Sequence, residues 1–282
     1  MPDAPAVDPL VDPFAGAGPK WLAGRTALVT GGGQNGTLPG VGYAICRLAA
    51  AHGARVAVLD RDPEAAQRTV KIIEQDGGEA MPVVADVTSD RSCAEAVATV
   101  VERWGTLDAL VNNVASGDRA GLFEVTPKRF DELMTLNLKS AWLMTRHAVP
   151  AMPRGSAIVN ISSVGVVARG PAMVYNVAKS GVENMTEGAA TTLGPQGIRV
   201  NCVRVGAIWG SFAAAHMDER MREPRRKMNA LQQEGTAWDI AYAALFLLSD
   251  RARWVSGHIL TVEGGPTYRP VEPVTSVPMD EE

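Results

Sequence analysis

Short runs rich in β-branched residues alternate with longer helical patterns from residue 25 onward. Several runs are apolar on both faces, as strands buried between two layers of helices must be. The candidate strands span residues 26–30, 54–60, 80–86, 107–113, 156–162, 198–203 and 258–262, and helical patterns lie near 42–52, 62–76, 91–104, 126–150, 172–193 and 238–249. This alternation predicts repeated βαβ units and an α/β fold with a doubly wound parallel sheet of about seven strands.

The predicted organisation is a single Rossmann-like domain with a segment at each end. Residues 1–22 are rich in Pro, Ala and Asp without apolar periodicity, so we expect a flexible N-terminal arm. The domain covers residues 23–265, and residues 266–282 carry four prolines, which indicates an extended C-terminal tail. Residues 209–234 form a long connection before the last strand, which we interpret as a lid over a ligand or as a pair of surface helices.

Bulk composition excludes several classes of protein. The net charge of -4 and the pI of about 5.7 provide no electrostatic footprint for nucleic acid. No apolar stretch approaches the roughly 20 residues of a membrane span, and the N-terminus has no secretory signal pattern. The three cysteines and four histidines are scattered, which argues against disulfides and against a metal site. We therefore expect a soluble, cytoplasmic protein without a bound metal.

A glycine-rich turn follows the first strand and leads directly into a helical run. Glycine allows the backbone to approach a pyrophosphate, whose charge is stabilised by free amides at a helix N-terminus. The candidate cradle consists of Gly31, Gly33, Gly40, Val41 and Gly42. Its position after a strand and before a helix indicates a dinucleotide site.

An acidic residue, Asp60, ends the second strand 20 residues after Gly40. A carboxylate there accepts hydrogen bonds from the adenosine ribose and repels a 2′-phosphate, which favours NAD over NADP. Arg61 follows directly and could pair with such a phosphate. NAD is therefore the expected cofactor, with NADP less favoured.

Tyr175 and Lys179 are four residues apart in a helical run, so their side chains share one face of the helix. A cation beside a phenol favours the phenolate, which would let the tyrosine exchange a proton nearer neutral pH than its ordinary pKa of about 10 allows. Carbonyl reduction and alcohol oxidation both need such a proton transfer. Alone, the same spacing is typical of an ordinary amphipathic pair.

In combination, these patterns resemble the classical short-chain dehydrogenase/reductase family, over residues 22–265. The quoted motifs are Thr30-Gly31 with Gly40 and Gly42, Asp86-Val87, residues 107–115, Leu136-Asn137, residues 159–163, Tyr175 with Lys179, and residues 199–206 and 256–265. Three positions depart from the family pattern. The turn holds about five extra residues within 34–39, Val114-Ala115 stands where Ala-Gly is usual, and Val205 replaces a proline.

The resemblance implies an NAD(P)-dependent oxidoreductase that interconverts a secondary alcohol and a ketone. It implies a catalytic set of Ser163, Tyr175, Lys179 and Asn137, in which Asn137 holds a water that connects Lys179 to solvent. Lys179 would also bind the nicotinamide ribose. Beyond the residues of the turn, Asp60 and Arg61, it implies cofactor contacts from Asp86, Val87, Asn113, Val114, Ala115, Tyr175, Lys179, Gly206 and Ile208.

Either of two adjacent serines could be the catalytic one. The usual spacing of thirteen residues before the tyrosine selects Ser162, whereas register on the strand selects Ser163. A one-residue deletion in the loop 164–174 would reconcile the two in favour of Ser163. We expect Ser116, Asp118, Val166, Arg169, Trp209 and Phe212 to line the substrate pocket.

Two other functions fit parts of the pattern. An enoyl reductase would suit the long nucleotide turn, but such enzymes place the lysine seven residues after the tyrosine, where this chain has Val182. A catalytically silent dinucleotide-binding or scaffold protein would suit the departures at Ala115 and Val205. Family analogy also predicts a homodimer or homotetramer, through the helices near 126–150 and 172–193.

Overall fold

The computed structural model describes residues 20–117, 120–168 and 172–266, which form seven parallel strands flanked by helices. The strands are β1 (Thr26–Thr30), β2 (Arg55–Asp60), β3 (Glu79–Val84), β4 (Ala109–Asn112), β5 (Ala157–Ser163), β6 (Arg199–Val205) and β7 (Ile259–Val262). Their order in the sheet is β3-β2-β1-β4-β5-β6-β7. The direction of winding reverses between β1 and β4, and a doubly wound sheet opens a crevice at the carboxyl ends of its strands at such a point. The predicted doubly wound sheet is confirmed.

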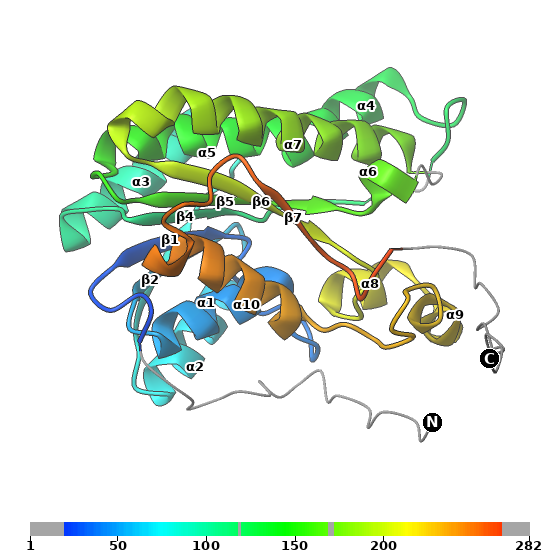
Figure 1. Cartoon of the computed structure of the whole chain (residues 1–282), viewed down its shortest axis with the longest axis horizontal. Coiled ribbons are helices and arrows are strands. Elements are labelled where there is room, and N and C mark those ends of the chain that lie inside the picture. The colour runs from blue at the N-terminus through cyan, green and yellow to red at the C-terminus, as the bar shows by residue number, and fades with distance from the viewer. Residues whose placement is uncertain (1–19, 118–119, 169–171, 267–282) are drawn as a thin grey trace, which may run out of the picture.

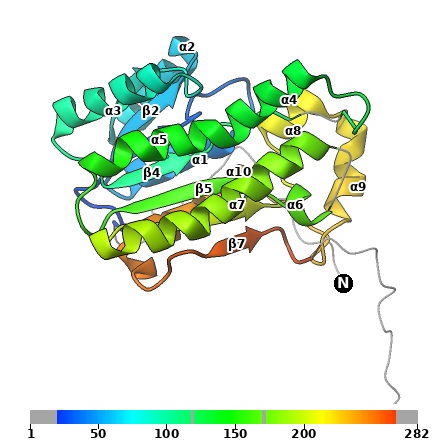
Figure 2. The ribbon, with the colours of Figure 1, turned by 90° about the horizontal axis from the view of Figure 1, so that it is seen from above.

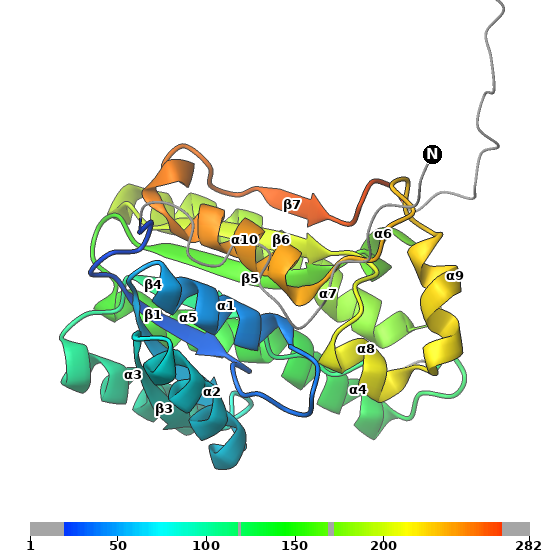
Figure 3. The same cartoon turned by 90° about the horizontal axis from the view of Figure 1, so that it is seen from below.

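Helices cover both faces of the sheet. One face carries α1 (Val41–Ala51), α2 (Pro63–Gln75) and α10 (Ala237–Leu248), and the other carries α3 (Asp90–Trp104), α5 (Ser140–Ala148) and α7 (Met173–Leu193). Figure 1 shows the sheet between these two layers, and Figure 2 and Figure 3 show the layers from above and from below. The short helices α4 (Pro127–Met134), α6 (Gly165–Ala168), α8 (Ser211–His216) and α9 (Arg222–Arg226) lie toward the carboxyl ends of the strands.

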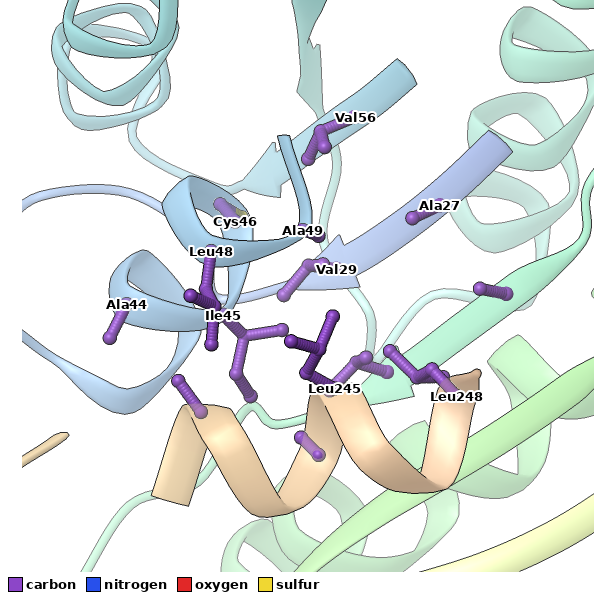
Figure 4. Close-up of a cluster of buried hydrophobic side chains, with 14 of the residues drawn as sticks. Ala27, Val29, Ala44, Ile45, Cys46, Leu48, Ala49, Val56, Leu245 and Leu248 are labelled. Carbon is purple, nitrogen blue, oxygen red and sulfur yellow. The ribbon is translucent and has the colours of Figure 1, made fainter. Parts of the chain in front are cut away.

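The core on the α1 side shows why these segments form amphipathic helices. Ile45 and Leu48 of α1 face Leu245 and Leu248 of α10, with Val29 of β1 beneath them (Figure 4). All five side chains are buried. Burying a side chain of this size contributes roughly 1.5–3 kcal/mol, so this contact fixes the helix that follows the glycine-rich turn.

The single helix expected near 126–150 is instead divided. After α4 comes a π-helical turn, η1 (Thr135–Lys139), which leads into α5. Within η1, the side-chain amide of Asn137 donates to the carbonyl of Leu133 at 2.9 Å. A π turn shifts the backbone pairing by one residue, and a side-chain donor of this kind satisfies the affected carbonyl. Periodicity could not reveal the break because the apolar pattern continues through it.

The connection predicted as a lid holds α8, a 3₁₀ turn (Glu219–Met221) and α9. Trp209 at its start is buried, and the guanidinium carbon of Arg222 lies 5.6 Å from the Trp209 ring centroid. Arg222 also binds both carboxylate oxygens of Glu234, so it contacts residues at both ends of the segment. The segment is therefore held together by contacts of its own, and the amide of Leu231 ties it to the domain by donating to the Gly264 carbonyl at 2.9 Å.

The terminal segments fall mostly outside the described residues, which leave out 1–19 and 267–282. Within the expected arm, Leu22 is buried and its amide donates to the carbonyl of His52 at 3.0 Å, so the packed domain begins before residue 23. Across the described ranges, no helix has both the length and the apolar character needed to cross a membrane. The same ranges contain no His, Cys, Asp or Glu cluster suited to a metal ion.

Candidate active site

The two adjacent serines at the end of β5 point to different partners. The hydroxyl of Ser163 is hydrogen-bonded to the phenol of Tyr175 and accepts from the amide of Gly165 at 3.2 Å. The hydroxyl of Ser162 is buried and donates to Oε1 of Glu183 at 2.8 Å. The structure therefore pairs Ser163, and not Ser162, with the tyrosine.

Lys179 lies one turn after Tyr175 on α7, and only 2% of its surface is exposed. Its ammonium donates to the carbonyl of Ile161 at 2.8 Å and lies 5.9 Å from the Tyr175 ring centroid. Burial lowers the pKa of Lys179 to about 8. The strand β5 thus contributes both the serine beside the phenol and the carbonyl that holds the lysine.

The phenol of Tyr175 differs from our expectation. Burial raises its pKa above the ordinary value, and the hydrogen bond with Ser163 opposes that rise. No lowering by Lys179 is found, and the Lys179 ammonium donates its hydrogen bond to the Ile161 carbonyl. In this state the phenol keeps its proton at neutral pH and is a hydrogen-bond donor.

Asn137 is buried at the π turn, next to the loop that follows β4. Its Oδ1 accepts from the Ser116 amide at 3.0 Å, and its Nδ2 donates to the Ser116 carbonyl at 3.1 Å. A small cavity of about 10 Å³ lies between Asn137 and Lys179, with Asn112 and Ile161 also in its wall. Such a volume is about what one water molecule needs. A water between Asn137 and Lys179 stays a prediction.

The glycine-rich turn packs so closely that a Cβ atom at several of its positions would clash with neighbouring atoms. Gly31 has a φ of +64°, and a Cβ on Gly42 would lie 2.1 Å from the Gly31 carbonyl oxygen. A Cβ on Gly33 would lie 2.6 Å from Oδ2 of Asp60. Gly40 begins α1 without a side-chain cap, and Val41 is the first residue of the helix. The turn therefore packs on its own neighbours in a way that requires glycine, and the uncapped N-terminus of α1 is of the kind that binds a pyrophosphate.

Two aspartates mark the ends of β2 and β3. Asp60 is buried, and it accepts from the amides of Gly33 at 3.0 Å and Asp62 at 3.1 Å. Asp86 is exposed, and two hydrogen bonds from Thr88 lower its pKa. The exposed Arg61 also lowers the pKa of Asp86 through its charge. Asp60, Asp86 and Arg61 thus lie at one edge of the sheet, where an adenosine would lie if the turn held a dinucleotide.

The residues after β4 support the turn. Nδ2 of Asn113 donates to the carbonyls of Thr30 at 3.0 Å and Gly31 at 3.2 Å. The Thr30 hydroxyl in turn accepts from the amides of Asn113 at 2.9 Å and Val114 at 3.3 Å. Sequence analysis placed Thr30 in the turn motif but gave its hydroxyl no role, although a buried threonine at the end of a strand signals a bonded hydroxyl. Val87 is buried beside this region, and Ala115 follows Val114 into the loop toward Ser116.

The segment after β6 closes the site from the opposite side. The Gly206 amide donates to the Val262 carbonyl at 2.9 Å, and a Cβ on Gly206 would lie 2.5 Å from Glu263. Ile208 follows in a tight turn, with its amide donating to the Gly206 carbonyl at 2.9 Å. Val205 extends β6, and its carbonyl accepts from the Val164 amide at 2.9 Å.

The long turn and the lid meet. The amide of Ser211, the first residue of α8, donates to the Pro39 carbonyl at 3.3 Å. On the other side of the site, the Phe212 ring lies 3.0 Å from the place that a Cβ on Gly117 would take. The extra residues of the turn therefore reach the lid. Two expected pocket residues, Asp118 and Arg169, lie outside the described residues.

Comparison with known proteins gives the same family throughout. Residues 36–267 match the family model described as enoyl-(acyl carrier protein) reductase. Momilactone A synthase of Oryza sativa subsp. japonica is 36% identical over 86% of this chain and 90% of its own length.

Solved structures agree with this result. A dehydrogenase/reductase from Sinorhizobium meliloti is 34% identical, covers 86% of this chain and 95% of its own, and superposes with a TM-score of 0.80. A short-chain dehydrogenase from Burkholderia cenocepacia, solved in complex with NADP, is 32% identical over 87% of this chain and 98% of its own, also with a TM-score of 0.80. The chain belongs to the classical short-chain dehydrogenase/reductase family of oxidoreductases.

Proposed function

We propose that this protein is an NAD(H)-dependent oxidoreductase that interconverts a secondary alcohol and a ketone, with Tyr175 as general acid and base. One observation carries the proposal: the Tyr175 phenol is hydrogen-bonded to Ser163 one helical turn from the buried Lys179. These side chains lie at the carboxyl ends of the parallel strands, as does the glycine-rich turn with Gly31 and Gly42.

In the reducing direction, Ser163 and Tyr175 hydrogen-bond the carbonyl oxygen of the substrate and orient it. A dinucleotide held at the glycine-rich turn and beside Asp60 would supply the hydride for the carbonyl carbon. Negative charge develops on the oxygen, and Tyr175 transfers its Oη proton there, which yields the alcohol. Lys179 holds positive charge beside the phenolate that remains, and a water between Asn137 and Lys179 returns the proton from solvent. Oxidation of the alcohol follows the same steps in reverse.

The preference for NAD rests on Asp60. Its carboxylate is held by the Gly33 and Asp62 amides at the place where a ribose would lie, and a 2′-phosphate there would be repelled. We expect Asp60→Ala to raise the Kd for NAD by about tenfold and to improve NADP binding relative to NAD, measured by fluorescence titration of the reduced cofactors. Glu74→Ala, which removes an exposed carboxylate of α2, is the matched control and should leave the affinities for both cofactors unchanged. An unchanged NAD-to-NADP ratio in Asp60→Ala would refute the assignment.

An enoyl reductase remains the second candidate because the matched family model carries that description. The position that its lysine would need is taken by Val182, which is buried and apolar. A panel of secondary alcohols, ketones and enoyl thioesters, followed by cofactor absorbance, separates the two activities. We expect turnover of alcohols and ketones alone; reduction of enoyl thioesters alone would overturn the proposal, and cofactor binding without any turnover would favour the silent alternative.

We also propose a homodimer or homotetramer in the cytoplasm. An open groove of about 600 Å³ runs between α7 and the α4–α5 region, lined in part by Met134, Leu138, Trp142 and Met185. Trp142 is 46% exposed, and a second copy packed on this face would cover it. All three cysteines are free and buried, which suits a reducing compartment. Light scattering of the wild type and of Trp142→Glu, for which we expect a smaller species, tests the assembly.

A further inference from the structure

A buried carboxylate, Glu183, lies one helical turn beyond Lys179 and has no place in the reaction described above. It is 8% exposed and belongs to the same stripe of α7 as Tyr175 and Lys179, because the three residues are spaced by four. A carboxylate this buried must be paired to remain charged. The hydrogen-bond partners of Glu183 therefore indicate its role.

Those partners come from three neighbouring strands. Ser162 of β5 is the register partner of Arg204 on β6, which is the partner of Thr261 on β7. Arg204 donates from Nε to Oε1 of Glu183 at 2.9 Å and from Nη2 to Oε2 at 2.7 Å. Its Nη1 donates to the Thr261 hydroxyl at 3.3 Å. One carboxylate thus joins α7 to a row of side chains across β5, β6 and β7.

The remaining bond to this carboxylate comes from the residue next to the proposed catalytic serine. The Ser162 hydroxyl donates to Oε1 of Glu183 at 2.8 Å, while Ser163 meets the Tyr175 phenol. Consecutive Cα atoms are about 3.8 Å apart, so a bond that holds Ser162 also fixes where Ser163 stands. The same bond ties β5 to α7 beside Lys179, whose ammonium is held by the Ile161 carbonyl of β5.

From this arrangement we infer that Glu183 is a positioning residue: through Ser162 it sets the register of α7 on β5 and so directs Ser163, rather than Ser162, to Tyr175. Arg204 neutralises the carboxylate and holds it in place by its bidentate pairing. The inference rests on the proposed function for its kinetic consequence, but its geometric consequence does not depend on that function.

The sharpest test compares two single-hydroxyl deletions in the same cluster. Ser162→Ala removes the bond between β5 and Glu183, whereas Thr261→Val removes the bond between β7 and Arg204 and leaves β5 untouched. Thermal unfolding first establishes that both variants fold and are similarly stable. We expect Ser162→Ala to lower kcat about tenfold with little change in the KM for the cofactor, because a small displacement of a reacting group is costly to the rate. Thr261→Val should change kcat less than about twofold.

A second pair of variants separates the hydrogen bond from the charges. Glu183→Gln with Arg204→Met removes the ion pair but keeps an amide oxygen that can accept from Ser162, whereas Glu183→Leu with Arg204→Met removes the acceptor as well. We expect the glutamine pair to keep kcat within about threefold of the wild type and the leucine pair to match Ser162→Ala. Equal kcat values for the two pairs would show that the cluster has only a structural role.

Crystal structures of Ser162→Ala and Thr261→Val decide the geometric part even if the proposed activity fails. The inference requires the hydrogen bond between Ser163 and Tyr175 to be lengthened or lost in Ser162→Ala and kept in Thr261→Val. An unchanged bond in Ser162→Ala would overturn it. If the wild type turns over no alcohol or ketone, the proposed function fails, while these two structures still give the answer on positioning.

Discussion

Two helical paths cover the same face of the sheet and place functional side chains in opposite ways. Helix α7 runs unbroken over 21 residues, and its regular spacing aligns Tyr175 and Lys179 along one stripe. The neighbouring path is interrupted between α4 and α5 by a π turn, and Asn137 lies within that turn. The regular spacing of helix α7 positions Tyr175 and Lys179, whereas the π turn positions Asn137.

The difference explains what each path contributes. On α7, burial and a single carbonyl bond hold Lys179 beneath the phenol. In the π turn, the Asn137 amide satisfies the Leu133 carbonyl and both backbone groups of Ser116, and so fixes the loop that follows β4. A change of Tyr175 or Lys179 should therefore act mainly on chemistry, whereas a change of Asn137 should also lower stability.

The largest effect is expected from removing the cation of α7. Lys179→Met keeps the length and the apolar stem but deletes the ammonium, so the phenolate formed in each turnover loses its nearby positive charge. We expect kcat to fall by about two to three orders of magnitude, as for the loss of a group that assists proton transfer. Ser180→Ala, at the exposed neighbouring position, is the control and should be almost neutral. Equal rates in the two variants would contradict a catalytic role for α7.

A substitution at the π turn should lower the free energy of unfolding. Asn137→Leu leaves the Leu133 carbonyl and the Ser116 backbone groups without their partners, which should lower the free energy of unfolding by about 2–4 kcal/mol. The same substitution at the exposed Asn184 of α7 should change it by about 0.5 kcal/mol or less. Urea denaturation of both variants gives the comparison. A loss at residue 184 as large as that at residue 137 would remove the distinction between the two paths.

A further effect is expected in the pH dependence of the free energy of unfolding, and it comes from the buried Lys179 of α7. The pKa of Lys179 is lowered from 10.5 to about 8 in the folded protein. Between these values the unfolded chain holds a proton that the folded protein has released, so the free energy of unfolding should rise with pH across this window. We expect the wild type to gain about 3 kcal/mol across this window relative to Lys179→Met, which has no proton to release. Parallel denaturation curves across the window would show that the ammonium is not buried.

The regular features, helix α7 and the glycine-rich turn, were predictable from the sequence, whereas the π turn was not. The stripe of Tyr175 and Lys179 follows from helical spacing, and the close approach at Gly31 and Gly42 follows from the absence of side chains in a strand-to-helix turn. The π turn left no signal, because Asn137 replaces a backbone donor with a side-chain donor inside an otherwise continuous apolar pattern. Choosing between Ser162 and Ser163 required long-range partners.

The cluster around Glu183 escaped sequence analysis for the same reason. Its hydrogen-bonded members lie 21 to 57 residues apart in the sequence, and only the register of β5, β6 and β7 brings Ser162, Arg204 and Thr261 into one row. The pKa of Tyr175 was also beyond sequence reasoning, because burial of the phenol in the folded protein raises it. Pairing across strands and side-chain direction are properties of the folded chain.

The central claim is that Tyr175 transfers the proton, and Tyr175→Phe tests it most directly because only one oxygen is removed. Steady-state turnover with secondary alcohols and ketones is measured alongside NADH binding by fluorescence. The account predicts that kcat falls by about three orders of magnitude or more while the Kd for NADH stays within about threefold of the wild type. A variant that binds NADH and turns over at the wild-type rate would contradict it.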